Sequence, residues 1–298
     1  MAATSANTHF SFTGSNDTLN LVGSGDTVTA TGSNDLINVS GFNDVVTVTG
    51  ATDTGSLTSA NTTFSFTGSN DIINVVGSGD TVTAMGNINT INVIGSNDAI
   101  TVNGNNNAAV LGTGTAQLIF TGSTNATTLG AGNDNVSYAN GTNVVSATLG
   151  TGATLHTGDI LNGGVGSDTV NLSGAGAFDF NTIIFKGFET VNMGANEALS
   201  FNGSNLAINA SIGGSDSFHF HSNLVSNNTI NNFIGGSAAN RDAIYLDASV
   251  LAAHQSAAQW ENTNVSSSNG NVIIHDGTDI ITVHNANVAA VIHDLFFV

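Results

Sequence analysis

The chain repeats a nine-residue pattern from Gly14 onward, as in GSNDTLNLV (14–22) and GSGDTVTAT (23–31). Glycine opens most units, an acid or amide is fourth, and apolar side chains are sixth and eighth, with Thr, Asn or Ser between them. Fourteen units follow without an insertion up to Ala139. A longer period of 54 residues relates Phe10–Gly14 to Phe64–Gly68. Such self-similarity is typical of repeat architectures.

The alternation within each unit predicts a short β-strand. Side chains such as Leu19 and Leu21 fall on one face of that strand, and the residues between them fall on the other. Glycine every nine residues would break a helix. A strand of about five residues cannot bury a face alone, so we expect neighbouring units to stack about 4.8 Å apart around a common core. With two units per coil, fourteen units make about seven coils.

The first and fourth positions of the unit predict special turns. Glycine at the first position suits either a positive φ angle or a close approach of two backbones. Aspartates at the fourth position would stack as like charges, so either their pKa values rise or cations lie between them. The alternative is that each aspartate binds the amides of its own turn, as the amides in the same column, Asn89, Asn107 and Asn125, suggest. The predicted calcium ligands of this column are Asp17, Asp26, Asp35, Asp44, Asp71, Asp80 and Asp98, and Asp53 shares the column.

The charge balance excludes several classes of partner. The 298 residues carry 21 acids and two basic residues, Lys186 and Arg241, for a net charge of −19. Two cations cannot neutralise a run of phosphates or hold an anionic membrane surface, so neither nucleic-acid binding nor membrane binding is expected. The 40% hydrophobic content differs from that of a disordered acidic tail. The chain has no cysteine and no apolar run long enough to span a membrane. Because its first residues contain neither a basic region nor an apolar stretch, we expect no amino-terminal signal peptide.

A motif in the middle of the chain carries a family resemblance. Gly163–Asn171 matches the nonapeptide G-G-x-G-x-D-x-U-x, and Gly130–Val136 matches its latter part. The segment resembles the RTX (repeats-in-toxin) proteins, including bacterial surface-layer and matrix proteins. That resemblance implies a parallel β-roll whose turns bind Ca²⁺ through Gly163, Gly164, Gly166 and Asp168, and through Gly130, Gly132 and Asp134. The amino-terminal units depart from this motif, because their aspartate follows the first glycine by three positions instead of five.

The carboxyl-terminal segment resembles the secretion region of type I exported proteins. The resemblance rests on Asn228–Phe233, Arg241–Asp247, Gly277–Val283 and Asp294–Val298. It implies export by the type I secretion apparatus to the outside of a bacterium, where calcium is abundant enough to drive folding. We therefore expect an all-β chain with three parts: a nonapeptide-repeat β-solenoid (1–139), a less regular RTX-like calcium-binding region (140–227) and a carboxyl-terminal secretion region (228–298).

Candidate catalytic groups are sparse. His219 and His221 lie on one face of a predicted strand and could form half of a metal site, although two polar residues flanking a core Phe220 is the simpler interpretation. Glu189 and Glu197 have no accompanying aromatic cluster of the kind that binds glycans. With no nucleophile, metalloprotease or phosphate-loop motif, we expect that the protein is not an enzyme.

The expected function is structural. An uncapped solenoid end beginning near Phe10 would expose strand edges that template another copy of the chain, so we expect calcium-dependent self-assembly into an extracellular fibre, surface layer or biofilm matrix. One alternative is an adhesin-like or ice-binding module, because Thr27 with Thr29 forms an outward T-x-T pair. Ice binding needs an unbroken ladder, and units 36–40 and 72–76 are expected to interrupt it. A second alternative is an exported polysaccharide-degrading enzyme.

Overall fold

The computed structural model describes residues 2–4, 6–148, 153–201, 205–221 and 226–298. The chain is almost entirely β-structure and forms a parallel β-solenoid of about 12 turns. The repeat predicts the solenoid but only about seven of its coils, because the later coils have no regular nine-residue spacing. Its contacts divide it into two units, one of residues 1–146 with 154–167 and one of 147–153 with 168–298. No helix among the described residues is long and apolar enough to cross a membrane.

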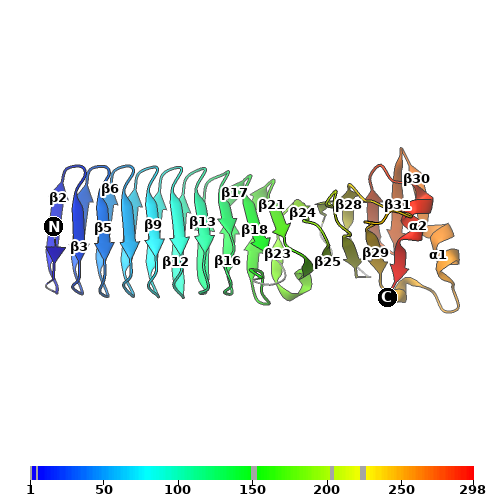
Figure 1. Ribbon diagram of the computed structural model, residues 1–298, viewed down its shortest axis with the longest axis horizontal. Helices are drawn as coiled ribbons and strands as arrows, with labels where there is room; N and C mark the ends of the chain where they lie inside the picture. Colours follow the sequence, from blue (N-terminus) through cyan, green and yellow to red (C-terminus); the bar gives the residue numbers. More distant parts are fainter. Residues whose placement is uncertain (1, 5, 149–152, 202–204, 222–225) are drawn as a thin grey trace. The chain divides into compact units, whose positions relative to one another are not determined.

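The first unit consists of two parallel sheets whose strands alternate along the chain, and Figure 1 shows these strands stacked from blue to green. Sheet A contains β1 (Ala2–Ala3), β3 (Thr18–Leu21), β5 (Leu36–Val39), β7 (Thr54–Leu57), β9 (Ile72–Val75), β11 (Thr90–Val93), β13 (Ala108–Leu111), β15 (Ala126–Thr128) and β18 (Val144–Thr148). Sheet B contains β2 (His9–Thr13), β4 (Thr27–Thr31), β6 (Val45–Thr49), β8 (Thr63–Thr67), β10 (Thr81–Met85), β12 (Asp98–Asn103), β14 (Ala116–Phe120), β16 (Asn135–Tyr138) and β19 (Ile160–Asn162).

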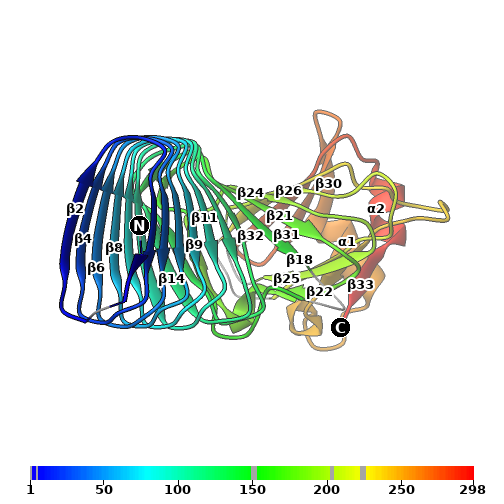
Figure 2. The same cartoon turned by 60° about the vertical axis from the view of Figure 1, so that its left-hand side comes forward.

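Each coil of the first unit contains two repeat units. Val28 pairs with Val46, and Val46 pairs with Phe64, so equivalent residues are two repeats apart. Figure 2 shows the turns of successive coils lying one behind another along both edges of this unit. The spacing first changes where Asn135 pairs with Ile160. There a larger loop is held by the short pair β17 (Asn140–Gly141) and β20 (Val165–Gly166).

The inward columns form the core that the alternation predicts. Leu19, Val28 and Phe64 are fully buried, whereas the residues between the inward positions are half-buried or exposed. Gly55 takes an inward position in β7 because a Cβ there would lie 2.5 Å from Cζ of Phe66. The missing side chain makes room for two phenyl rings in the coil that follows.

The second unit keeps the two-sheet arrangement with longer and less regular loops. One row of hydrogen-bonded strands in this unit contains β21 (Thr169–Ser173), β24 (Thr190–Asn192), β26 (Ala207–Asn209), β28 (Asn227–Asn231), β32 (Asp279–Val283), β31 (Asn271–Asp276) and β30 (Val265–Ser268). Sheet D contains β22 (Gly176–Asp179), β25 (Glu197–Phe201), β27 (Ser217–Phe220), β29 (Ala243–Leu246) and β33 (Leu295–Phe297). The remaining elements are β23 (Ile184–Lys186), two 3₁₀ turns (Phe180–Thr182 and Ala248–Val250), α1 (Ala257–Asn264) and α2 (Val288–His293).

The carboxyl-terminal end of the second unit is capped. Its parallel strands give way to the antiparallel pairs β32–β31 and β31–β30. Helix α1 begins with a capping box between Ser256 and Gln259 and buries Trp260, whose ring packs edge-on against Phe297 at 5.2 Å. Antiparallel pairing and a covering helix are common ways to end a stack of parallel strands.

Candidate functional site

The glycine column is required by close approach of successive coils. A Cβ on Gly50 would lie 1.4 Å from the carbonyl oxygen of Gly32, and a Cβ on Gly68 would lie equally close to that of Gly50. No side chain fits at such distances. Some of these glycines also have a positive φ angle, as at Gly86 (φ 135) and Gly104 (φ 138), and positive φ angles recur two positions later, at Asn34 (φ 61) and Asn43 (φ 59) among others. The sequence left both explanations open for the first position. The structure shows the close approach at most of these glycines and a positive φ angle at some of them.

The aspartates of the repeat clamp one coil to the previous one. Asp35 is 2% exposed, and its Oδ1 accepts a hydrogen bond from the backbone N–H of Asp17, 2.9 Å away and eighteen residues earlier. The same bond joins each later pair in its column, and a second column on the opposite edge begins with Asp26 and Asp44. The prediction that these residues bind amides is therefore correct in kind, but the amide belongs to the neighbouring coil.

The second carboxylate oxygen of the repeat aspartates, Oδ2, is buried without a hydrogen-bond partner. Oδ2 of Asp53 has no hydrogen-bond partner among the described residues, and the same holds for Asp26, Asp35, Asp44, Asp71, Asp80 and Asp98. Burial raises the pKa of Asp53 and of Asp80 to about 6, against the lowering effect of the accepted backbone bonds, and neighbouring aspartates add to the rise. In the same way burial raises the pKa of Asp134 to about 7.

Neutral side chains make the same clamp. Oδ1 of Asn89 accepts from the N–H of Asp71 at 2.9 Å, and Oδ1 of Asn107 accepts from the N–H of Asn89 at 2.8 Å. Nδ2 of Asn107 also donates to the carbonyl oxygen of Gly86 at 3.2 Å. This position of the repeat needs an acceptor for a backbone N–H, and it does not need a charge.

The repeat aspartates do not converge on a common point. Among the described residues there is no group of three or more His, Asp or Glu side chains placed to hold a metal ion. One oxygen of each aspartate is used by an amide, which leaves a single buried oxygen per turn beside glycine carbonyls, whereas Ca²⁺ takes six to eight oxygens. Calcium binding by these columns stays a prediction.

The RTX-like motifs lie at the end of the regular stack. The N–H of Gly130 donates to Oδ2 of Asp134 at 3.1 Å, so this aspartate caps its own turn. A Cβ on Gly132 would lie 2.0 Å from the oxygen of Gly114. In the second motif, Gly163, Gly164 and Gly166 belong to the first unit and Asp168 to the second. Gly164 has a φ of +87°, and a Cβ on it would lie 2.1 Å from the oxygen of Tyr138.

The second unit repeats the clamp at irregular spacing, which the nine-residue count missed. In this unit an acid directly before a strand, or at its first residue, accepts from the preceding coil at Glu189, Asp216, Asp242, Asp279 and Asp294, and Asp159 does the same at the end of the first unit. The signal was present in the sequence as an acid followed by alternating apolar residues, as in Asp216–Phe220 and Asp242–Leu246. Glu189 therefore has a structural bond to the N–H of Asp168.

The two histidines flank a core phenylalanine. Phe220 is buried, while the ring of His219 stacks on Tyr245 at 4.4 Å. Nδ1 of His221 lies 3.6 Å from Oδ1 of Asp247. The interpretation of these histidines as polar residues on either side of a core position is confirmed.

The amino-terminal coil exposes a surface that is covered elsewhere in the same unit. Residues 10–17 and 64–71 have identical sequences. Phe64 and Phe66 are fully buried between β6 and β10, whereas Phe10 and Phe12 in β2 are half-buried. Among the described residues β2 pairs only with β4. Its other edge carries unpaired strand N–H and C=O groups next to partly exposed aromatic rings.

The fold places the protein in the class of parallel β-solenoids, with a coil compatible with an RTX-like β-roll. No protein-family model, no curated protein and no solved structure matches the chain.

Proposed function

We propose that this is an extracellular structural protein that assembles with copies of itself through its amino-terminal coil. The observation that carries the proposal is the contrast between Phe10 with Phe12 and their buried duplicates Phe64 with Phe66. The covered copy shows that this sequence is suited to receive another strand on that edge. Strand pairing would satisfy the edge amides and bury both rings.

The geometry favours pairing between two amino-terminal coils. The second unit ends in the antiparallel strands β31 and β30 on one side, and in β33 on the other, where Phe297 packs against Trp260 of α1. Its carboxyl-terminal coil therefore does not offer two free parallel edges of the kind found at the amino-terminal coil. Two copies of one edge make a closed, two-fold contact, since the same patch serves both partners. Further growth into a fibre, surface layer or matrix then requires a second contact, for which we propose calcium bridging of the acidic surfaces.

Membership of the RTX family, calcium-dependent folding and type I export are parts of the same proposal. The glycine and aspartate motif at 163–171, the carboxyl-terminal segments and the two-repeat coil support them. On this proposal the chain folds after export, because millimolar calcium outside the cell binds its acidic turns.

The experiment replaces the exposed rings of β2. We expect the double variant Phe10→Lys/Phe12→Lys to remain monomeric in millimolar calcium, because charge on an edge strand opposes pairing. We expect the unchanged protein to sediment as dimers or larger species that a chelator reduces in size. Analytical ultracentrifugation and negative-stain electron microscopy give the two measurements.

The matched control is Phe42→Lys/Ile88→Lys. Both side chains are more than half exposed on turns of the same unit, away from the β2 edge. This variant should assemble as the unchanged protein does. An unchanged protein that is monomeric with and without calcium would contradict the proposal, and so would full assembly of the β2 variant.

Ice binding is a second candidate function, favoured by a row of outward Ser and Thr hydroxyl groups across the strands of sheet B. The expected interruption does not occur, because residues 36–40 and 72–76 supply β5 and β9 of the opposite sheet. The strand register instead aligns outward hydroxyls across six neighbouring strands at Ser11, Thr29, Thr47, Ser65, Thr83 and Thr101. Stacking places them about 4.8 Å apart, which forms a regular array that ordered water could match.

A bulky side chain in the row tests this candidate. We expect Thr47→Tyr to abolish thermal hysteresis and ice-affinity partitioning, because the protruding ring would keep the row of hydroxyl groups from contacting the ice surface. Thr54→Tyr places the same ring on the outward face of sheet A and should leave both readouts unchanged. Absence of hysteresis in the unchanged protein rules this candidate out.

A further inference from the structure

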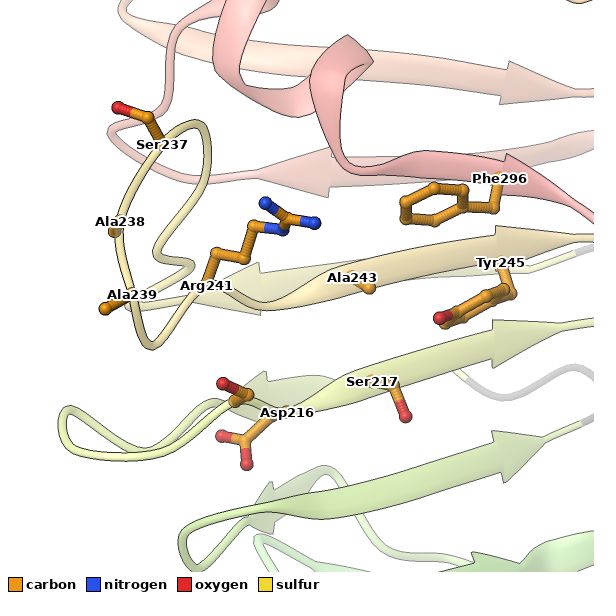
Figure 3. A pocket seen from close by; sticks show the side chains of 10 residues that line it. Asp216, Ser217, Ser237, Ala238, Ala239, Arg241, Ala243, Tyr245 and Phe296 are labelled. Carbon is orange, nitrogen blue, oxygen red and sulfur yellow. The ribbon is translucent and has the colours of Figure 1, made fainter.

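A cavity of about 640 Å³ lies on the outer face of sheet D in the second unit (Figure 3). Its floor consists of small outward residues, Ser217 on β27 and Ala243 on β29, which are register neighbours. The loop of Ser237, Ala238 and Ala239 borders one side. Because larger side chains follow two positions later on the same strands, the small residues leave a hollow in the face of the sheet.

The stacked rings of Tyr245 and Phe296 form the opposite side of this hollow, and His219 continues the stack beyond it. Across β27, β29 and β33 the register aligns His219, Tyr245 and Phe296. The centroids of His219 and Tyr245 are 4.4 Å apart with planes at 7°, and those of Tyr245 and Phe296 are 5.2 Å apart at 25°. Burial, and then the neighbouring His221, lowers the pKa of His219, which favours the neutral form of this ring. Phe296 remains 37% exposed.

Arg241 brings a fixed set of hydrogen-bond donors to the cavity. Its Nε lies 3.1 Å from Oδ1 of Asp294, a carboxylate with no exposed surface that also contacts Nδ1 of His293 at 2.8 Å. The Arg241 side chain is about half exposed, and Figure 3 shows its guanidinium group directed toward the ring of Phe296. Arginine has five N–H donors in a rigid fork, so the bond through Nε leaves the terminal amino groups for a ligand.

We propose that this cavity binds a neutral saccharide. Aromatic faces suit the apolar C–H face of a pyranose ring, and donors beside them suit its hydroxyl groups. The volume is that of a small-molecule site. An acidic sugar is disfavoured because Asp294 offsets the charge of Arg241, and the remaining net charge of −19 repels anions.

In this site the sugar ring lies against Tyr245 and Phe296, and its hydroxyls bond to Arg241 and Ser217. The cavity belongs to the second unit, and the β2 edge belongs to the first. Different substitutions therefore test saccharide binding and self-assembly, and either proposal can be contradicted while the other holds. A protein with both properties would attach a glycan to its own assembly.

The test is a titration of the full chain with four neutral trisaccharides, maltotriose, cellotriose, laminaritriose and mannotriose, and with trigalacturonate as the acidic probe. Calorimetry and saturation-transfer NMR report binding. We expect saturable binding of at least one neutral trisaccharide and weaker binding of trigalacturonate. Tyr245→Ala should lower the affinity about tenfold. Ala243→Leu should do the same by filling the floor, without removing a buried group.

Two controls lie outside the cavity. Ser200→Ala changes the strand next to His219 in the same outward row, and Lys186→Ala removes the other basic residue of the chain. Both should bind as the unchanged protein does, and thermal melts should show that all variants fold. Arg241 is not substituted, because its removal would leave the buried carboxylate of Asp294 without its ion-pair partner. Absence of saturable binding by all four neutral sugars overturns the proposal, as does tighter binding of trigalacturonate or unchanged affinity in both cavity variants.

Discussion

Gly50→Val is expected to lower the free energy of unfolding of the first unit by about 3 kcal/mol or more. The new Cβ would lie 1.4 Å from the oxygen of Gly32 and 2.8 Å from Oδ2 of Asp53. Both neighbours belong to stacked turns whose backbones are held by bonds between coils, so the clash can be relieved only by separating coils. Urea unfolding followed by circular dichroism measures the loss, and hydrogen exchange shows whether it spreads from this coil.

Gly79→Asn is the matched control within the same unit. Gly79 has a φ of +73°, and asparagine adopts the same conformation one coil later at Asn97 (φ 60). A Cβ there meets only the movable Oδ1 of Asn61 at 2.7 Å and the more distant atoms of that residue. We expect a change of no more than about 1 kcal/mol. Equal destabilisation by the two variants would show that close approach is not what selects glycine in the first column.

The metal-free protein is expected to be more stable near pH 5 than near pH 8. Burial raises the pKa of Asp53 and Asp80 to about 6 and that of Asp134 to about 7, whereas an unfolded aspartate titrates near 3.9. Between about pH 4 and pH 7 the folded chain therefore holds more protons, so stability falls as the pH rises through that interval and levels off above it. About 1 kcal/mol moves the melting temperature by about 2–4 °C at this size, and a shift at least that large is expected in calorimetry.

Asp53→Asn should reduce this pH dependence. An amide can accept the N–H of Asp35 through Oδ1, as Asn89 accepts that of Asp71, and it removes the charge from a buried position. We expect a higher melting temperature than the unchanged protein at pH 8 and little difference at pH 5. Asp179→Asn removes one charge from an exposed 3₁₀ cap and serves as the control. A variant that melts at a lower temperature than the unchanged protein at pH 8 would contradict this expectation. It would show that the ionised carboxylate of Asp53 stabilises the folded state, as a carboxylate that binds a cation would.

Much of the candidate site was predictable from the repeat itself. The column of aspartates, the inward pairs such as Leu19 with Leu21 and the two-unit coil all follow from spacing, because a strand has a side-chain period of two and a coil returns to its own register. The donor that each aspartate would bind did not follow. Asp35 accepts from Asp17 in another coil, and its own turn does not contain that N–H.

Local pattern determined that this chain is a parallel β-solenoid, which residues face its core and which turns need glycine or an acceptor. Tertiary structure alone decided what the stacking of coils and the packing of longer loops bring together. It assigned the hydroxyls of Thr29 and Thr47 to one unbroken row on sheet B, left Phe10 at an edge where Phe64 is covered, and set Arg241 beside Tyr245 and Phe296. These neighbours are far apart in sequence, and only the register between coils makes them adjacent.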